Sequence, residues 1–197
     1  MTQKAEHPPQ KYSRAPYAIA ILGALGVVIT AWVARDFFQP VGPGTRAPEF
    51  EVANLAGEMV SLEDYRGKVV LVNIWATWCA PCRQEMPSMQ RLYEELEGTD
   101  FEIVAISVDA PIGTMAPTGG LGGNVAEFVE EFGLTFPILH DKSGKLQFTY
   151  QTTGLPESFL LDRNGVIYKK LAGGAEWDAD QHKDVILRLL EETTPDR

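Results

Sequence analysis

Cys79 and Cys82 are the only cysteines of the 197-residue chain, and they stand three positions apart in Trp78-Cys79-Ala80-Pro81-Cys82. A disulfide between them would close so short a loop that it would stabilise the fold little. At this spacing one thiol can instead attack a foreign disulfide while the other resolves the mixed disulfide that forms. We therefore interpret the pair as a redox group rather than as a structural crosslink.

The alternative for a Cys-x-x-Cys pair is half of a zinc site, which needs four ligands. The chain has no second cysteine pair, and His7, His140 and His182 are scattered along it. A haem attachment motif would need histidine at position 83, which is Arg83. The sequence favours redox chemistry, and we expect no metal and no cofactor beyond the cysteine pair itself.

Sequence patterns place the pair between a buried strand and a helix. Residues 69–75 (VVLVNIW) form an apolar run typical of a strand covered on both faces, whereas residues 80–97 carry apolar side chains at helical spacing. A helix N-terminus offers free N–H groups and a positive dipole end, which favour the thiolate of Cys79. Pro81 suits an early helical position, because its missing N–H costs nothing there.

The rest of the soluble part has strand and helix patterns in alternation. A strand–helix–strand order with two buried strands indicates a parallel βαβ unit, and Asn164-Gly165 indicates a tight antiparallel turn. We predict an α/β sandwich with a central mixed sheet and helices on both faces. The expected elements are a hairpin within 50–61, a helical turn at 62–65, strands at 101–108 and 135–139, helices at 124–132, 145–150 and 178–191, and a hairpin of 158–162 with 166–171.

An uncharged stretch, residues 15–34, precedes this part. A helix of about 20 apolar residues can cross the hydrocarbon core of a membrane. The competing interpretation is a cleaved signal peptide, which needs a small residue three positions before the cleavage point. Cleavage after Ala31 or Ala34 would place Ile29 or Trp32 there. The sequence therefore favours one uncleaved N-terminal transmembrane helix.

Charge asymmetry orients this predicted helix. Up to Ala34 the chain has three basic residues and one acid, whereas the remainder has 14 basic and 26 acidic residues. The positive-inside rule then places the N-terminus in the cytoplasm and the body in a periplasm-like compartment. The net charge of -10 argues against a nucleic-acid partner. We predict a cytoplasmic tail (1–14), a transmembrane anchor (15–34), a linker (35–48) and a folded domain (49–197).

Two blocks resemble one known family. Residues 73–87 (NIWATWCAPCRQEMP) resemble the thioredoxin-like proteins of the TlpA/ResA type, and residues 154–165 (GLPESFLLDRNG) resemble the Gly-x-Pro segment of the same family. The resemblance covers residues 42–192. It implies a thioredoxin-like fold and an extracytoplasmic, often membrane-anchored thiol–disulfide oxidoreductase; many such proteins act in cytochrome c maturation.

Matched by position, the resemblance implies that Cys79 is the exposed nucleophile and Cys82 the resolving thiol. Pro156 corresponds to a cis-proline facing the disulfide, and its missing N–H would leave the backbone of Leu155 free to pair with a substrate chain. Glu85 matches an acid near the thiols, which could accept the proton of Cys82. The predicted substrate-binding residues are Trp78, Pro81 and Leu155.

Structural alternatives stay open for these positions. Without the resemblance, Pro156 would be read as an ordinary trans turn proline. Glu85 could be a solvated carboxylate on the helix surface, and Trp78 could cover the helix end rather than form a docking surface. Asn73 and Trp75 are interpreted as core residues.

The stretch 111–123 (PIGTMAPTGGLGG) is longer than the family has at this point. It lacks the Gly-Lys-Ser/Thr signature of a phosphate-binding loop. A solvent loop is the default interpretation. The second hypothesis is that the stretch leaves the same sheet edge as Cys79 and shapes partner access.

The predicted function is reduction of disulfides in target proteins such as apocytochrome c. An oxidising compartment supplies no electrons for this, so a membrane thiol donor is expected. One alternative is a copper-handling chaperone of the same fold, to which only His140 or His182 could add a histidine ligand. Another is a disulfide-forming oxidase, because the potential depends on how far each sulfur is stabilised. A peroxidase would need a Thr-x-x-Cys setting that Cys79 lacks.

Overall fold

The computed structural model describes residues 15–34, 40–116 and 119–192, with side chains in the first range described for 22–32. The chain divides into two units between Pro40 and Val41. The first holds helix α1 (Ala15–Ala34), which has the bounds predicted for the membrane helix. No helix in the described ranges is long and apolar enough to cross a membrane, so the predicted span is not confirmed. The predicted tail 1–14 lies outside the described residues, as do positions 35–39 of the linker.

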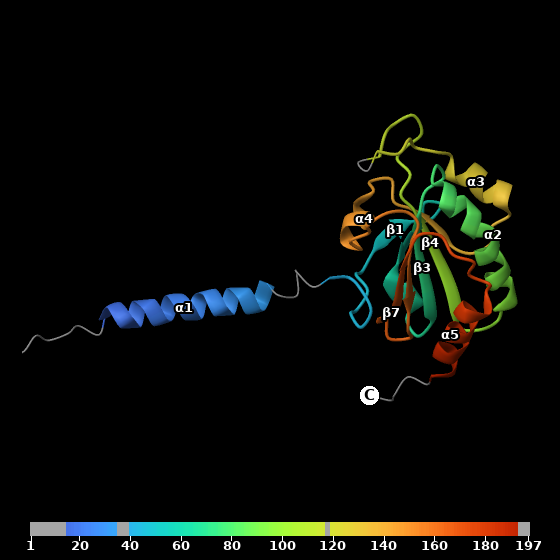
Figure 1. The fold of residues 1–197 in the computed structure, drawn as a ribbon. Coiled ribbons are helices and arrows are strands. Elements are labelled where there is room, and N and C mark those ends of the chain that lie inside the picture. Colours follow the sequence, from blue (N-terminus) through green and yellow to red (C-terminus); the bar gives the residue numbers. More distant parts are fainter. Residues whose placement is uncertain (1–14, 35–39, 117–118, 193–197) are drawn as a thin grey trace, which may run out of the picture. The chain divides into compact units, whose positions relative to one another are not determined.

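A five-stranded mixed sheet, in the order β5-β4-β3-β6-β7, forms the centre of the second unit (Figure 1). Strand β3 (Val69–Trp75) runs parallel to β4 (Phe101–Ser107) and antiparallel to β6 (Glu157–Leu161). Strand β5 (Ile138–His140) continues the parallel side, and β7 (Ile167–Ala172) the antiparallel side. The predicted mixed sheet with a C-terminal antiparallel hairpin is therefore confirmed.

The burial of the central strands agrees with their apolar sequence patterns. Every residue of β3 and β4 is buried, as expected for strands covered on both faces. The β6–β7 turn has Gly165 at φ 74°, a left-handed conformation that glycine adopts without strain. The third strand of the parallel side begins later than predicted, at Ile138 rather than Thr135. Pro137 precedes it and has no N–H to donate to a strand ladder.

Helices cover both sides of the sheet (Figure 1). Helices α2 (Ala80–Glu95) and α5 (Asp180–Glu191) lie side by side on one side, joined by an ion pair from Lys183 Nζ to Glu95 Oε1 at 3.1 Å. The short helix α4 (Lys145–Thr149) lies on the other side. The remaining elements are β1 (Glu51–Ala53), β2 (Met59–Ser61), the 3-10 helix η2 (Leu62–Tyr65) and α3 (Val125–Phe132).

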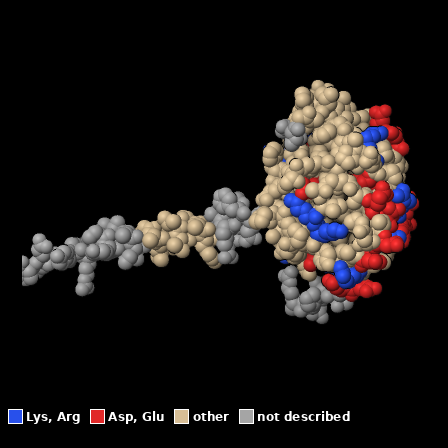
Figure 2. All heavy atoms as spheres, in the orientation of Figure 1, with Lys and Arg blue, Asp and Glu red and all other residues tan. Residues whose placement is uncertain are grey.

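Charged side chains are unevenly spread over this unit. Figure 2 shows acidic residues gathered with basic ones on the side formed by α2, α3 and α5, and a further group of basic side chains over the middle of the view. The end of the molecule that carries residues 110–123 shows no charged side chain in this view. The sequence of that stretch contains no Asp, Glu, Lys or Arg.

Candidate active site

Cys79 and Cys82 form a disulfide at the N-terminus of α2. Cys79 is the N-cap residue, and its Sγ accepts a hydrogen bond from the N–H of Cys82 at 3.3 Å. Cys82 is completely buried, whereas Cys79 keeps 5% of its surface exposed. The prediction of an exposed nucleophile therefore needs correction: only an edge of Cys79 is accessible, because the disulfide packs against its neighbours. The helix N-terminus favours the thiolate of Cys79 once the bond is reduced.

A groove of about 480 Å³ borders Cys79. Trp78, Ala80 and Pro81 line it on the cysteine side. Residues 152–155, from the loop before β6, line it together with Gln147. The structure thus brings the three predicted substrate-binding residues, Trp78, Pro81 and Leu155, to the same groove. Trp78 is 41% exposed, so part of its ring is accessible at the groove.

The loop before β6 has the cis peptide bond that the resemblance implies, between Leu155 and Pro156. The loop is fixed on both sides of Leu155. The N–H of Thr153 donates to Oε2 of the buried Glu157 at 2.7 Å, and the carbonyl of Pro156 accepts from the N–H of Gly173 at 2.8 Å. Within the described residues, the backbone N–H and C=O of Leu155 have no hydrogen-bond partner. They are available to an incoming chain.

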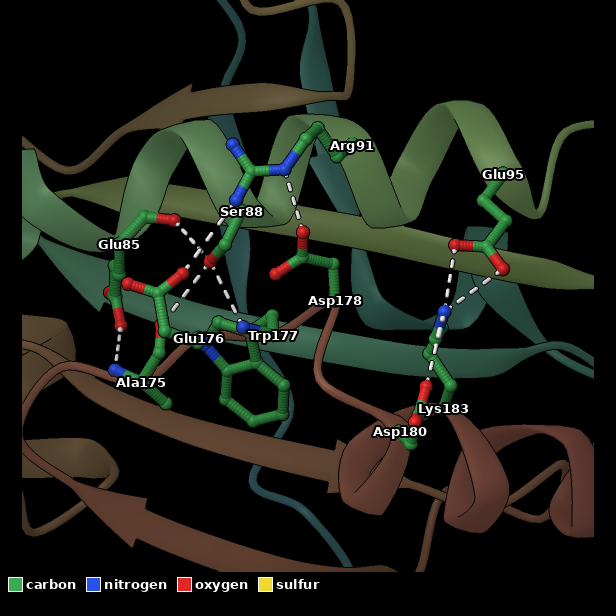
Figure 3. A network of polar contacts seen from close by, with 10 residues as sticks. All are labelled: Glu85, Ser88, Arg91, Glu95, Ala175, Glu176, Trp177, Asp178, Asp180 and Lys183. Atoms are coloured by element: carbon green, nitrogen blue, oxygen red, sulfur yellow. Dashed lines mark hydrogen bonds and ion pairs between the residues drawn. The ribbon is translucent and has the colours of Figure 1, made fainter.

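Glu85 is buried, with 2% of its surface exposed, so the alternative of a solvated carboxylate is wrong. It stands three positions after Cys82 on the same face of α2. Its Oε1 accepts from Asn73 Nδ2 at 2.8 Å, and its Oε2 accepts from the Ala175 N–H at 3.2 Å (Figure 3). Burial raises the pKa of Glu85 to about 7, although both hydrogen bonds act to lower it. A carboxylate with this pKa can accept and release a proton near neutral pH.

Asn73 positions Glu85, a role that the sequence analysis missed. Its Nδ2 also donates to Ser158 Oγ at 2.9 Å, so one amide connects β3 with α2 and β6. The available signal was a single amide within the apolar run of β3. Trp75 is a core residue as predicted, completely buried and packed on Phe128.

A polar network holds the segment that supplies the Ala175 N–H (Figure 3). Ser88 Oγ accepts from the Trp177 N–H at 2.9 Å and contacts the Ala175 carbonyl at 3.2 Å. Arg91 Nε donates to Asp178 Oδ2 at 2.6 Å. These contacts join residues 175–178 to α2. They therefore hold the Ala175 N–H in position to donate to Glu85 Oε2.

Asp109 connects the turn before α2 (residues 76–79, the cysteine turn) with the stretch 110–123, the glycine-rich loop. It is buried and accepts three hydrogen bonds from the two segments: the Thr77 N–H at 2.8 Å, the Thr77 hydroxyl at 2.6 Å and the Gly123 N–H at 3.1 Å. The sequence analysis missed this residue too. Its signal was an acid just after β4, at the sheet edge where the parallel strand β3 also ends.

The glycine-rich loop touches the cysteine turn at Gly120. A Cβ atom at this position would overlap the ring of Trp78. We expect Gly120→Ala to lower the free energy of unfolding by about 1–3 kcal/mol, because ring or loop must move. Gly42→Ala is the control, since nothing lies near a Cβ there. Urea unfolding of both variants measures the difference, and equal stability would contradict the packing.

The two histidines considered for copper lie apart from the groove. His140 Nε2 is 2.8 Å from the Asp109 carbonyl oxygen, and His182 packs against the Trp177 ring. Within the described part of the chain, no three His, Cys, Asp or Glu residues gather as a metal site would require. No observation in these ranges therefore favours the copper alternative.

Comparisons with known proteins decide the family. Residues 43–170 match the AhpC/TSA family. The thiol-disulfide oxidoreductase ResA of Geobacillus thermodenitrificans is 38% identical over 85% of this chain and 91% of its own length. The chain belongs to the AhpC/TSA family and is a ResA-type thiol–disulfide oxidoreductase. The ResA protein of Geobacillus kaustophilus is 35% identical, over 90% of this chain and 98% of its own.

Solved structures agree with the fold of this ResA-type oxidoreductase. A thiol:disulfide interchange protein of the thioredoxin family from Chlorobium tepidum is 26% identical, with a TM-score of 0.60 over 75% of this chain and 97% of its own. StoA from Bacillus subtilis is 28% identical, with a TM-score of 0.53 over 68% of this chain and 92% of its own. The predicted thioredoxin-like fold is confirmed.

Proposed function

We propose that this ResA-type oxidoreductase reduces disulfides in target proteins such as apocytochrome c, with Cys79 attacking and Cys82 resolving. One observation carries the assignment of roles. Cys79 alone borders the groove that Leu155 also lines, whereas Cys82 is fully buried, one helical turn before Glu85. The proposal takes the cysteine pair as the whole redox group, without a metal or other cofactor.

The exchange has two steps. In the first, the Cys79 thiolate attacks one sulfur of the target disulfide, and the other target sulfur leaves as a thiolate that takes up a proton. In the second, Glu85 accepts the proton of Cys82, and the Cys82 thiolate attacks Cys79 Sγ. The mixed disulfide breaks, the second target sulfur leaves as a thiolate that takes up a proton, and the Cys79–Cys82 disulfide forms.

The proposal includes a membrane anchor at residues 15–34, a cytoplasmic N-terminus and an extracytoplasmic domain. The uncharged sequence of this stretch supports it, as do the exposed side chains of Leu22, Val27 and Trp32, whose apolar surface hydrocarbon would cover. Anchoring would keep the domain beside the membrane thiol donor that must reduce Cys79–Cys82 after each turnover.

Removal of residues 1–34 should release the protein from membranes; a full-length chain found in the soluble fraction would contradict the anchor.

The equilibrium reduction potential of Cys79–Cys82 tests the direction of electron flow. We expect a value near that of thioredoxin, about -270 mV, because a reductase must give its electrons to target disulfides. Equilibration with glutathione or dithiothreitol buffers, followed by thiol alkylation, gives the potential. A value near about -120 mV, as for a strong oxidant, would support the disulfide-forming alternative instead.

A further inference from the structure

Three large apolar side chains of the glycine-rich loop are exposed. Ile112 is 71% exposed, and Met115 and Leu121 are each 66% exposed. Met115 and Leu121 face each other in an antiparallel bridge, next to a hydrogen bond from the Ala116 N–H to the Gly120 carbonyl at 2.7 Å. Directly opposed residues of such a pair have their side chains on one face. The loop therefore presents an ordered apolar pair to its surroundings.

This loop is packed against the cysteine turn at two points. Gly120 lies on the Trp78 ring, and Gly123 is joined to Thr77 through Asp109. Both glycines are needed for this approach, because a Cβ at either position would overlap the turn. We call Trp78, Ile112, Met115 and Leu121 the apolar rim. Trp78 also lines the groove at Cys79, so the rim adjoins that groove through Trp78, whereas Ile112 lines a neighbouring hollow.

The residues that line the groove and the residues of the loop carry no charged side chain of their own. None of the residues that line the groove is ionisable apart from Cys79 itself, and residues 110–123 contain no charged side chain. This neutral end contrasts with the charged side of the molecule in Figure 2 and with the net charge of -10. A charged group buried in the groove would lose its hydration without gaining a partner, whereas Lys142 and His140 border only the separate hollow beside Ile112. An apolar side chain would gain from burial.

We propose that the apolar rim binds the target polypeptide beside its reacting cysteine and selects uncharged segments with a large apolar residue next to that cysteine. This inference rests on the proposed function and names its substrate class. The occupant is an extended chain, since the unpaired backbone of Leu155 across the groove can hydrogen-bond to one.

Two synthetic peptides, each with one internal disulfide, test the inference on the reduced full-length protein. One has Leu and Phe beside its cysteines, and the other has Lys and Glu in their place. We expect kcat/KM for the apolar peptide to be about tenfold higher or more. In the triple variant I112S/M115S/L121S this preference should fall to within about threefold, because three apolar contacts are lost.

The matched control is the double variant M59S/L187S, which removes exposed apolar side chains that belong neither to the rim nor to the groove. It should keep the wild-type preference. Circular dichroism checks that the variants fold, and Leu121→Ser alone serves if the triple variant does not.

The possible outcomes separate the two proposals. If wild-type protein reduces both peptides equally, or the triple variant keeps the preference, the rim inference is wrong while the proposed function stands. If wild-type protein reduces neither peptide, both proposals fail. A concentration-dependent dimer that the triple variant abolishes would identify a second copy of this chain as the occupant and overturn the inference.

Discussion

Replacement of Cys79 with Ser is expected to lower disulfide exchange by about a thousandfold or more, because the attacking sulfur is lost. Cys82→Ser should behave differently. Its Cys79 can still attack a target disulfide, but the mixed disulfide cannot be resolved and should accumulate. Single-turnover reactions with a peptide disulfide, followed by mass spectrometry under non-reducing conditions, measure both the rate and the covalent adduct.

The structure explains why the two variants should differ in forming the adduct. Cys79 borders the groove, and Cys82 has no exposed surface, so only Cys79 should carry the adduct. The double variant C79S/C82S provides the blank. An adduct on Cys82 in the Cys79→Ser protein would reverse the assignment of attacking and resolving sulfurs.

Glu85→Gln is expected to slow resolution of the mixed disulfide by about a hundredfold above neutral pH, because Gln cannot accept the Cys82 proton. In the wild type, Glu85 is mostly protonated below its pKa of about 7 and cannot then accept a proton. The rate at which the wild-type protein resolves the mixed disulfide should therefore rise as pH passes through that value. The variant should lose this rise. Rapid-mixing measurements of the second step across pH 5 to 9 would show it.

Glu85 also makes the free energy of unfolding depend on pH. The dependence has the opposite sign to that of a salt-bridged acid, whose pKa is lowered by folding. Burial raises the pKa of Glu85 from 4.5 to about 7, so between these values the folded protein holds a proton that the unfolded chain has released. The free energy of unfolding contributed by Glu85 is therefore fully present below about pH 4.5 and is lost as pH rises to 7. The loss amounts to roughly 3 kcal/mol.

The Gln side chain in Glu85→Gln does not titrate. The free energy of unfolding of this variant relative to wild type should therefore increase by roughly 3 kcal/mol between pH 4.5 and 7.5. Urea unfolding at several pH values measures the difference. Glu51→Gln, which changes an exposed glutamate, is the control and should follow the wild-type curve. Parallel curves for wild type and Glu85→Gln would show that the Glu85 carboxyl titrates normally.

Local features of this protein could be predicted from the sequence because their causes are local. The bounds of β3 follow from an apolar run interrupted only by Asn73, and the start of α2 agrees with Pro81 at an early helical position. The turn at Gly165 follows from a backbone conformation that glycine favours. The cysteine spacing determined the redox interpretation, and the resemblance supplied the cis bond at Pro156.

Only the tertiary structure decided how these parts work together. The raised pKa of Glu85 depends on burial and on partners at positions 73 and 175, far from it in sequence. The limited exposure of Cys79 and the contact of Gly120 with Trp78 likewise arise where distant segments meet. The sequence by itself determined which groups can react; packing between distant segments decided which sulfur is accessible and which carboxyl can take its partner's proton.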